Sequence, residues 1–175
     1  MFTEIFDIRK GFYNKHPKFS DKDNVPFIGA TDSNNGITGL TTWEEIRQSS
    51  KVGYGPNEPF SHKKFPGNCI CVTNNGSVGY AYYQATPFTC SHDVNPLYLK
   101  RRELNRPIGL YLAACIEKQR VCFEYARKWR PKRMVNSKLM LPVKIDGTPD
   151  YEYMEAYIKN IEANQIQKYL DFKAC

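Results

Sequence analysis

Alternating and continuous apolar runs predict several strands in the first hundred residues. EIFDIRK (4–10) alternates apolar and polar positions, and VPFIGA (25–30) is a short apolar run. NCICVTNNGSVGYAYY (68–83) holds two apolar runs around Asn74-Asn75-Gly76, residue types that tolerate the positive φ of a hairpin turn. PFTCSHDVNPLYL (87–99) adds one or two strands. This part of the chain is therefore predicted to be rich in strands.

A spacing of three to four residues between apolar positions predicts the main helix. It covers 105–129, with Pro107 suited to its first turn and Pro131 preventing its continuation. Its apolar stripe consists of Ile108, Tyr111, Leu112, Cys115 and Ile116.

Two more helices and a last strand complete the pattern. TTWEEIRQSS (41–50) is a short helix capped by Thr41 or Thr42, and KLMLPV (138–143) is a short strand. A terminal helix runs from its cap, Asp150, to about Leu170. Its apolar seam consists of Tyr151, Met154, Ile158 and Ile161. Several strands, a helix, a strand and a terminal helix together indicate an α+β fold with a mixed or antiparallel sheet.

Positive charge is concentrated in one part of the chain. The net charge of the 175 residues is +7, yet residues 100–138 hold twelve Lys or Arg against three Glu, which is +9, so the remainder sums to −2. Five of the seven residues at 127–133 are cationic. A concentrated basic block indicates a polyanionic partner, and a solvated basic helix face is the alternative.

The remaining composition indicates a cytoplasmic protein. No apolar run approaches the roughly 20 residues of a membrane helix, and MFTEIFDIRKGF lacks the regions of a signal peptide. We therefore expect no membrane partner. The six cysteines fit no zinc spacing, and we interpret them as small buried residues in a reducing compartment. Cys69 and Cys71 point the same way along their predicted strand.

No catalytic or metal-binding pattern stands out, so we predict no catalytic residue, no metal ligand and no cofactor. The three histidines are scattered, and there is no phosphate-binding loop. Asn95-Pro96-Leu97-Tyr98 imitates an amino-methyltransferase motif but lacks its second proline. Asp150 and the Asp171-Phe172-Lys173 run imitate a nuclease metal site, but they lie at opposite ends of one predicted helix.

Three segments carry residue types that suit DNA recognition: Thr31–Thr38, Asn74–Ser77 leading into Tyr80, and Tyr125–Arg133. Asn pairs with adenine, Arg pairs with guanine, and cations neutralise phosphates. The candidate contact residues are Lys10, Thr31, Asn34, Asn35, Thr38, Asn74, Asn75, Tyr80, Arg127, Lys128, Arg130, Lys132 and Arg133. The alternatives are turn chemistry for the asparagines, sheet packing for the tyrosines and a solvated loop for the cations.

These stretches resemble a known family. In order and spacing, VPFIGATDSNNGITG, VTNNGSVGYAYYQATPFTCSHDVNPLYLK and YARKWRPKRMVNSKLMLPVKIDGTPDYEYMEAYIKNIE are similar to the specificity (S) subunits of type I restriction–modification systems. They look equally like the related subunits of some type II enzymes that fuse cleavage and methylation. The resemblance covers roughly residues 3–162.

The resemblance implies a non-catalytic target-recognition domain over 1–149 that clamps one half of a split double-stranded DNA site. It also implies a helix over 150–175 that docks on a methyltransferase subunit, with restriction subunits as further partners. The methyl donor, ATP and Mg²⁺ would belong to those partners. Asn34, Asn35, Asn74 and Asn75 match the family's turns. The basic stretch, expected to contact phosphate, contains Arg127, Lys128, Arg130, Lys132 and Arg133.

One departure from the family leaves alternatives open. A full specificity subunit holds two recognition domains separated by long helices, whereas this sequence shows one domain and one helix. It is a half-sized subunit, a fragment, or a chain that dimerises through 150–170 to read a palindromic split site. The other functional hypotheses are a single-strand nucleic-acid or protein-interaction module, in which Tyr80, Tyr82 and Tyr83 stack on bases, and a catalytic nuclease or methyltransferase fragment.

Overall fold

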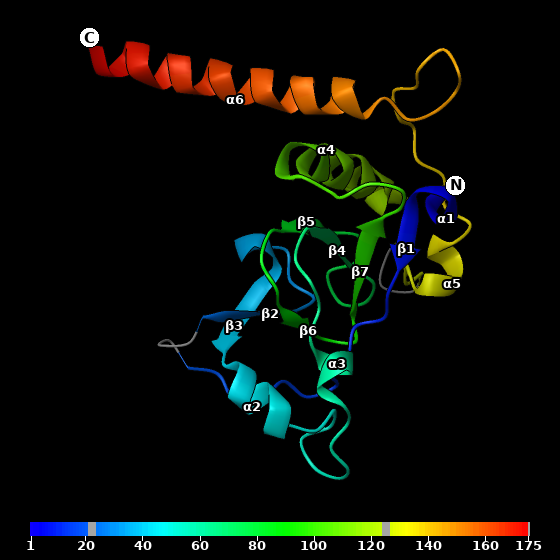
Figure 1. Ribbon diagram of the computed structural model, residues 1–175, viewed down its shortest axis with the longest axis vertical. Coiled ribbons are helices and arrows are strands. Elements are labelled where there is room, and N and C mark those ends of the chain that lie inside the picture. Colours follow the sequence, from blue (N-terminus) through cyan, green and yellow to red (C-terminus); the bar gives the residue numbers. More distant parts are fainter. Residues whose placement is uncertain (21–23, 124–126, 175) are drawn as a thin grey trace.

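A computed structural model describes residues 1–20, 24–123 and 127–174 (Figure 1). The helices are α1 (Phe2–Ile5), α2 (Trp43–Gln48), α3 (Phe60–Lys63), α4 (Arg106–Glu117), α5 (Pro131–Met134) and α6 (Tyr151–Ala174), with 3₁₀ turns η1 (Asn34–Gly36) and η2 (Lys118–Cys122). The strands are β1 (Phe6–Ile8), β2 (Val25–Ile28), β3 (Ile37–Thr41), β4 (Cys69–Thr73), β5 (Ala81–Gln84), β6 (Thr89–Cys90) and β7 (Val94–Leu99).

The strands form two sheets. The larger has the order β1-β7-β4-β5 and all its pairs are antiparallel. The smaller has the order β3-β2-β6, with β2 antiparallel to β3 and parallel to β6. Figure 1 shows α4 and α6 above the larger sheet, and α2 and α3 at the opposite end of the molecule. The predicted α+β fold with mixed and antiparallel pairing is confirmed.

Both faces of β4 are covered, which explains why all five of its residues are buried. Ile70 and Val72 pack into a core cluster with α4, while Cys69 and Cys71 pack into a second cluster with residues of β2 and β6. This alternation follows from the period of two along a strand. Cys69 and Cys71 therefore point the same way, as the sequence predicts.

The hairpin predicted at 68–83 is confirmed. β4 and β5 pair from Cys69 with Gln84 to Val72 with Ala81. Gly76 and Gly79 both have positive φ, at +69° and +82°, and Thr73 closes the turn with bonds to Tyr80 and Ser77. The turn thus lies at the carboxyl end of β4.

α4 is shorter than the helix predicted over 105–129. Asn105 caps it, its Oδ1 accepting from the Ile108 backbone N–H at 3.1 Å, and Ile108, Leu112 and Ile116 are buried on the larger sheet. The α-helix ends at Glu117 because the buried stripe ends at Ile116, and the chain tightens into η2. Cys122 at the end of η2 is exposed, so the expectation of buried cysteines is wrong at this position.

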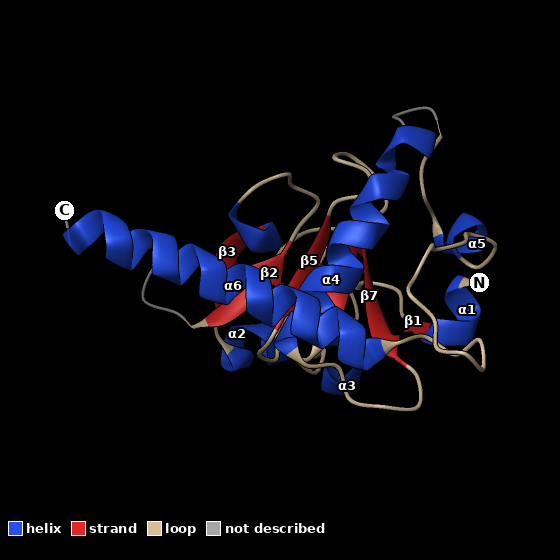
Figure 2. Ribbon diagram, turned by 90° about the horizontal axis from the view of Figure 1, so that it is seen from above, coloured by secondary structure: helices blue, strands red, loops and turns tan. Residues whose placement is uncertain are grey.

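α6 begins as predicted and packs on α4 through its first half. Asp150 Oδ1 accepts from the Tyr153 N–H at 3.0 Å, Met154 is fully buried, and Tyr157 meets Tyr111 of α4 edge to face at 5.6 Å. Ile161, expected in the apolar seam, is 41% exposed. Figure 2 shows α6 crossing α4 and continuing beyond it. None of the described helices is both long and apolar enough to cross a membrane.

Two predicted strands differ from the structure. At 4–10 only Phe6–Ile8 is a strand, because Phe2–Ile5 forms a helical turn that buries Phe2. At 138–143 the described chain pairs with no strand, and Val143 makes only an isolated bridge to Pro149. Pro142 has no N–H to donate, and Met140 is 90% exposed, so this stretch lacks both the partner and the burial of a strand.

Candidate nucleic-acid interface

A single tryptophan anchors the basic segment, which we define as residues 127–133. Trp129 is fully buried, stacks on Phe123 at 4.6 Å and meets Phe2 edge to face at 5.4 Å. Its Nε1–H donates to Ser137 Oγ at 2.9 Å. The indole therefore fixes the middle of the basic segment to the core, beside the N-terminal turn of the chain.

A second anchor follows on α5. Met134 is fully buried in the same core cluster, and Pro131 begins the helical turn. Arg127, Arg130, Lys132 and Arg133 are exposed. Arg133 Nη1 donates to the Lys128 carbonyl oxygen at 2.8 Å, which closes the segment on itself. Apolar anchors on either side thus force these cationic side chains outward.

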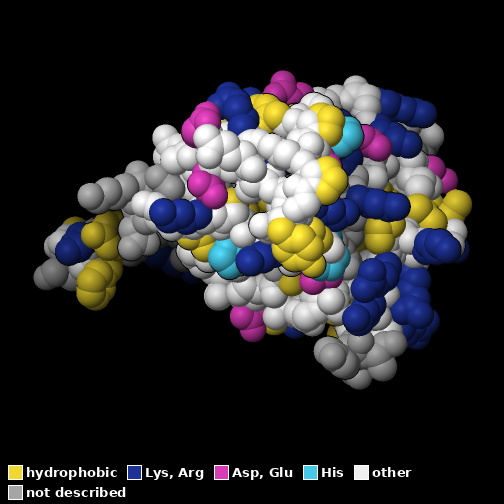
Figure 3. Space-filling model, turned by 90° about the horizontal axis from the view of Figure 1, so that it is seen from below, with side chains coloured by type: hydrophobic (Ala, Val, Ile, Leu, Met, Phe, Trp, Pro, Cys, Tyr) yellow, Lys and Arg dark blue, Asp and Glu magenta, His cyan; other side chains and the backbone are white. Residues whose placement is uncertain are grey.

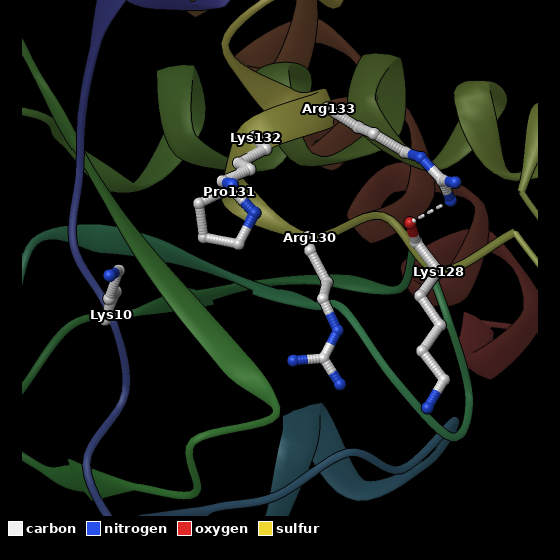
Figure 4. Close-up of a pocket in the computed structure, with 6 residues that line it drawn as sticks. All are labelled: Lys10, Lys128, Arg130, Pro131, Lys132 and Arg133. Carbon is white, nitrogen blue, oxygen red and sulfur yellow. Dashed lines mark hydrogen bonds between the residues drawn. The ribbon is translucent and has the colours of Figure 1, made fainter.

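Four of the five cations of the basic segment, all except Arg127, line one cavity of about 570 Å³ together with Lys10 (Figure 4). Its lining residues are Lys10, Lys128, Arg130, Pro131, Lys132 and Arg133. Among the described residues, no acidic side chain lines it. Lys10, predicted only as an isolated candidate, is brought here from a distant part of the sequence.

Register explains the position of Lys10. The chain beyond β1 continues alongside β7, where Arg9 N–H donates to the Pro96 carbonyl at 2.8 Å and Gly11 N–H to the Val94 carbonyl at 3.0 Å. Val94 in turn pairs with Thr73, the last residue of β4. Lys10 and the Asn74–Gly79 turn therefore lie at the same end of the larger sheet.

The two asparagines of that turn differ in environment. Asn74 is 2% exposed, and its Nδ2 donates to Asn95 Oδ1 at 2.6 Å and to the His92 carbonyl at 3.3 Å. Asn75 is half-buried, and its Nδ2 donates to Asp93 Oδ1 at 3.0 Å. Asn95 is itself buried and donates to the Arg9 carbonyl at 2.8 Å. The Asn74–Asn95 pair is thus a structural link between the turn and the chain before Lys10, and the methyltransferase-like Asn95-Pro96 motif is part of a buried strand.

The second predicted turn packs against β5. Asn34 and Asn35 have positive φ, at 49° and 50°, and Asn35 Nδ2 donates to the Tyr83 carbonyl at 3.2 Å. Asn34 is exposed, and its Nδ2 donates to the Ile37 carbonyl at 3.0 Å. Thr38 is also exposed. This turn therefore lies on the β5 side of the larger sheet, whereas Lys10 lies on the β1 side.

Thr31 and Tyr82 connect the two turns, and Tyr80 lies beside Tyr82. The Thr31 carbonyl accepts from the Tyr82 hydroxyl at 3.1 Å, and a Cβ added at Gly76 would lie 3.6 Å from Ala30. Tyr80 is half-buried beside the turn, and its ring is parallel to that of Tyr82 at 6.4 Å. Burial raises the pKa of Tyr82 to about 12, further above neutral pH than the ordinary tyrosine value.

The structure adds cations that sequence analysis missed. Lys10 also lines a neighbouring cavity of about 470 Å³ together with Arg9, Lys51, His62 and Lys64, although Glu58 lies there too. Figure 3 views the face opposite α6 and shows Lys and Arg side chains gathered towards one side of it. Arg9 adjoins Lys10, and Lys64 follows His62 and Lys63, but these short groups lie far apart in the sequence and far from the basic segment, so no single charge run signals them.

Among the residues that the structure describes, no three His, Cys, Asp or Glu side chains gather in an arrangement that could hold a metal ion. The predicted contact segment 125–133 begins at Tyr125 and Ala126, which lie outside the described residues.

Comparisons with known proteins identify the family of this chain. Residues 2–170 match the family model "Type I restriction modification DNA specificity domain". A curated relative, the specificity subunit S.BcgI of a type II restriction enzyme from Heyndrickxia coagulans, is 38% identical over 160 residues, which is 91% of this chain and 41% of the relative.

Two solved structures share the fold. The S subunit of a type I restriction–modification system from M. genitalium aligns with a TM-score of 0.58 and 17% identity, covering 97% of this chain and 40% of that one. The HsdS subunit from Thermoanaerobacter tengcongensis aligns with a TM-score of 0.56 and 13% identity, covering 93% and 36%. This chain thus spans about two fifths of the length of its relatives, and it belongs to the family of type I restriction–modification DNA specificity domains.

Proposed function

We propose that this chain is a target-recognition domain that binds double-stranded DNA sequence-specifically for a restriction–modification enzyme and has no catalytic role itself. One observation carries the proposal: five cationic side chains from two distant parts of the chain line one cavity without an acid among its described lining residues. Such a field attracts a phosphate backbone and gains affinity by releasing counterions. Family membership supports the same conclusion.

The adjoining cavity extends this basic surface. Lys10 lines both cavities, so Lys51 and Lys64 continue the surface from the basic segment across the end of the larger sheet. Backbone phosphates recur along a duplex, and a row of cations suits them better than a single cluster does. We therefore assign Lys10, Arg127, Lys128, Arg130, Lys132 and Arg133 to phosphate contacts, with Lys51 and Lys64 as additions.

Sequence reading needs groups that reach base edges. Asn34, Thr38 and Asn75 keep some exposure, as do Thr31, Asn35 and Tyr80, so we retain these six as candidates for base or sugar contacts. Asn74 is left out, because its amide is buried and bonded to Asn95 and His92. Its role in the proposal is to hold the turn that presents Asn75.

The test measures duplex affinity as a function of salt. For each phosphate contact, log K falls with a slope of about −0.9 against log salt, so Arg130→Ala and Lys132→Ala should each lower the magnitude of the slope by about 1. Fluorescence anisotropy with a labelled duplex gives affinities from 50 to 200 mM salt. Lys168→Ala, an exposed cation on α6, serves as the matched control and should leave the slope unchanged.

Two results would contradict the proposal. One is a wild-type affinity that does not change with salt. The other is a tighter preference for single strands than for duplex, which would favour the stacking role of Tyr80, Tyr82 and Tyr83 instead.

We further propose that the chain divides into a DNA-binding domain over 1–149 and a helix over 150–175 that joins it to other subunits. Four apolar side chains in the second half of α6, which we name the distal face, are between 53% and 76% exposed: Ile166, Tyr169, Leu170 and Phe172. Among described residues they have no packing partner in the core clusters. The partner we propose is a methyltransferase subunit, as the family implies, and a second copy of α6 is the alternative that the experiment in the Discussion distinguishes.

A further inference from the structure

Arg120 is a cation outside the basic segment whose side chain is held in one orientation. It lies in η2, and its guanidinium carbon is 3.6 Å from the centroid of the Tyr80 ring. Tyr80 is itself parallel to Tyr82, with 9° between the ring planes. A guanidinium stacked on an aromatic face keeps its planar donor edge free and loses little freedom on binding.

The backbone around Arg120 is built to admit it. A Cβ at Gly79 would lie 2.5 Å from Arg120 Cγ, and Gly79 has a φ of +82°. Glu117 Oε1 accepts from the Ala81 N–H at 3.0 Å, which ties the end of α4 to the start of β5. Both contacts place η2 against the hairpin, so the aliphatic part of Arg120 passes over the glycine.

The guanidinium has one enclosed nitrogen and an open edge. Arg120 Nε is buried, and the described residues offer it no hydrogen-bond partner. The side chain as a whole is only half-buried, so the two Nη groups are the donors that a ligand reaches. Buried donors are ordinarily paired, and an unpaired one marks a site that is held for another purpose.

The charges nearby argue against a phosphate as that ligand. Glu117 and Asp32 both lie close enough to raise the pKa of Tyr82, the neighbour of Tyr80 in the stack, after burial as the larger cause. A phosphate beside this stack would lie in a region that holds carboxylates, whereas the described residues that line the cavity of the basic segment include no acid. A neutral acceptor pair suits this environment better.

We propose that Arg120 reads a base, donating from its two Nη groups to the O6 and N7 acceptors of a guanine in the major groove. Guanine is the base that presents two acceptors side by side there, and the planar fork of arginine matches them. Arg120 thus becomes a specificity-determining residue of the proposed DNA recognition, and the inference rests on that proposed function. Tyr80 and Gly79 are positioning residues for it.

The experiment begins with selection of duplexes from a random pool by the wild-type chain. Arg120→Ala and Arg120→Lys are then compared with Lys118→Ala, an exposed cation two positions earlier in η2. Both Arg120 variants should bind the selected duplex roughly ten- to hundredfold more weakly. They should lose the preference for one G·C pair, with the salt slope unchanged. Arg120→Lys keeps the positive charge and the aliphatic stem packed over Gly79. Weaker binding by this variant would therefore be due to the absent planar guanidinium.

Three outcomes would overturn the inference. If both Arg120 variants kept the selectivity of the wild type, the proposed contact between Arg120 and a guanine would be excluded. An equal loss on all duplexes, with a salt slope lower by about 1, would make Arg120 a phosphate ligand. Selection of no duplex by the wild type would overturn the proposed function and this inference together, whereas normal selection by the wild type confines a failure to Arg120. Thermal unfolding of each variant shows whether it is folded.

Discussion

Trp129 anchors the basic segment to the core. Its ring is fully buried between Phe123 and Phe2, while the neighbouring Arg130 is exposed. Because the buried ring and the exposed cations are neighbours in the sequence, the ring fixes where the positive charges lie. A solvated loop would leave their positions undefined. The same ring therefore contributes to both the stability of the domain and the geometry of the cavity.

Replacing Trp129 tests this double role. Trp129→Ala should lower the free energy of unfolding by about 3–5 kcal/mol, because it removes a large buried ring and leaves a cavity. Trp129→Phe should lose less, since it keeps the stack on Phe123 but not the hydrogen bond to Ser137. Denaturant titration gives these values, with the exposed neighbour Arg127→Ala as a control expected within about 0.5 kcal/mol of wild type. An unchanged unfolding midpoint for Trp129→Ala would show that the segment is not anchored.

At the scale of elements, α6 has two halves with different environments. Met154 is fully buried and Tyr157 packs on Tyr111, and Arg106 Nη1 pairs with Glu162 Oε1 at 2.5 Å. Beyond Glu162 the described helix contributes no residue to the core clusters. The first half therefore belongs to the fold, and the distal face is available to a partner.

Substitutions in the two halves should separate stability from association. Met154→Ala should cost about 2–5 kcal/mol of unfolding free energy, whereas Leu170→Ala should change it by less than about 0.5 kcal/mol. Leu170→Ala combined with Phe172→Ala should instead weaken binding to a methyltransferase subunit, measured by light scattering of the mixed proteins. A mass near twice 20.3 kDa for the chain alone, lost in the double variant, would identify a second copy as the occupant. Full association of the double variant would exclude the distal face as the contact.

At the scale of the molecule, local sequence patterns predicted the helices and strands better than they predicted the features that depend on tertiary contacts. The hairpin at 68–83, the Thr42 cap of α2 and the Asp150 cap of α6 depend on neighbouring residues, and each is in place. The end of α4 and the missing strand at 138–143 depend on tertiary burial, which periodicity does not report. Asn74 and Asn75 are adjacent and identical in type, so only the folded structure shows that the first is buried and the second is partly exposed.

The candidate interface shows the same division. The charge run predicted Arg130 and Lys132, because charges adjacent in sequence remain adjacent in a short segment. Lys51 and Lys64 lie within residues 1–99, where nine Lys or Arg are balanced by nine Asp or Glu, and only register and loop packing bring them beside Lys10. Arg120 was hidden inside a helix prediction that ran past Glu117, so the stack on Tyr80 had no signal in the sequence.

Acetylation of lysines with and without a selected duplex tests whether the dispersed cations form one DNA-binding surface. Mass spectrometry reports the rate at each lysine. We predict that bound duplex slows acetylation of Lys10, Lys51, Lys64, Lys128 and Lys132 and that added salt reverses this protection. Lys168 and Lys173 on α6 should react at the same rate throughout. Protection spread evenly over all lysines, or strongest on α6, would contradict it.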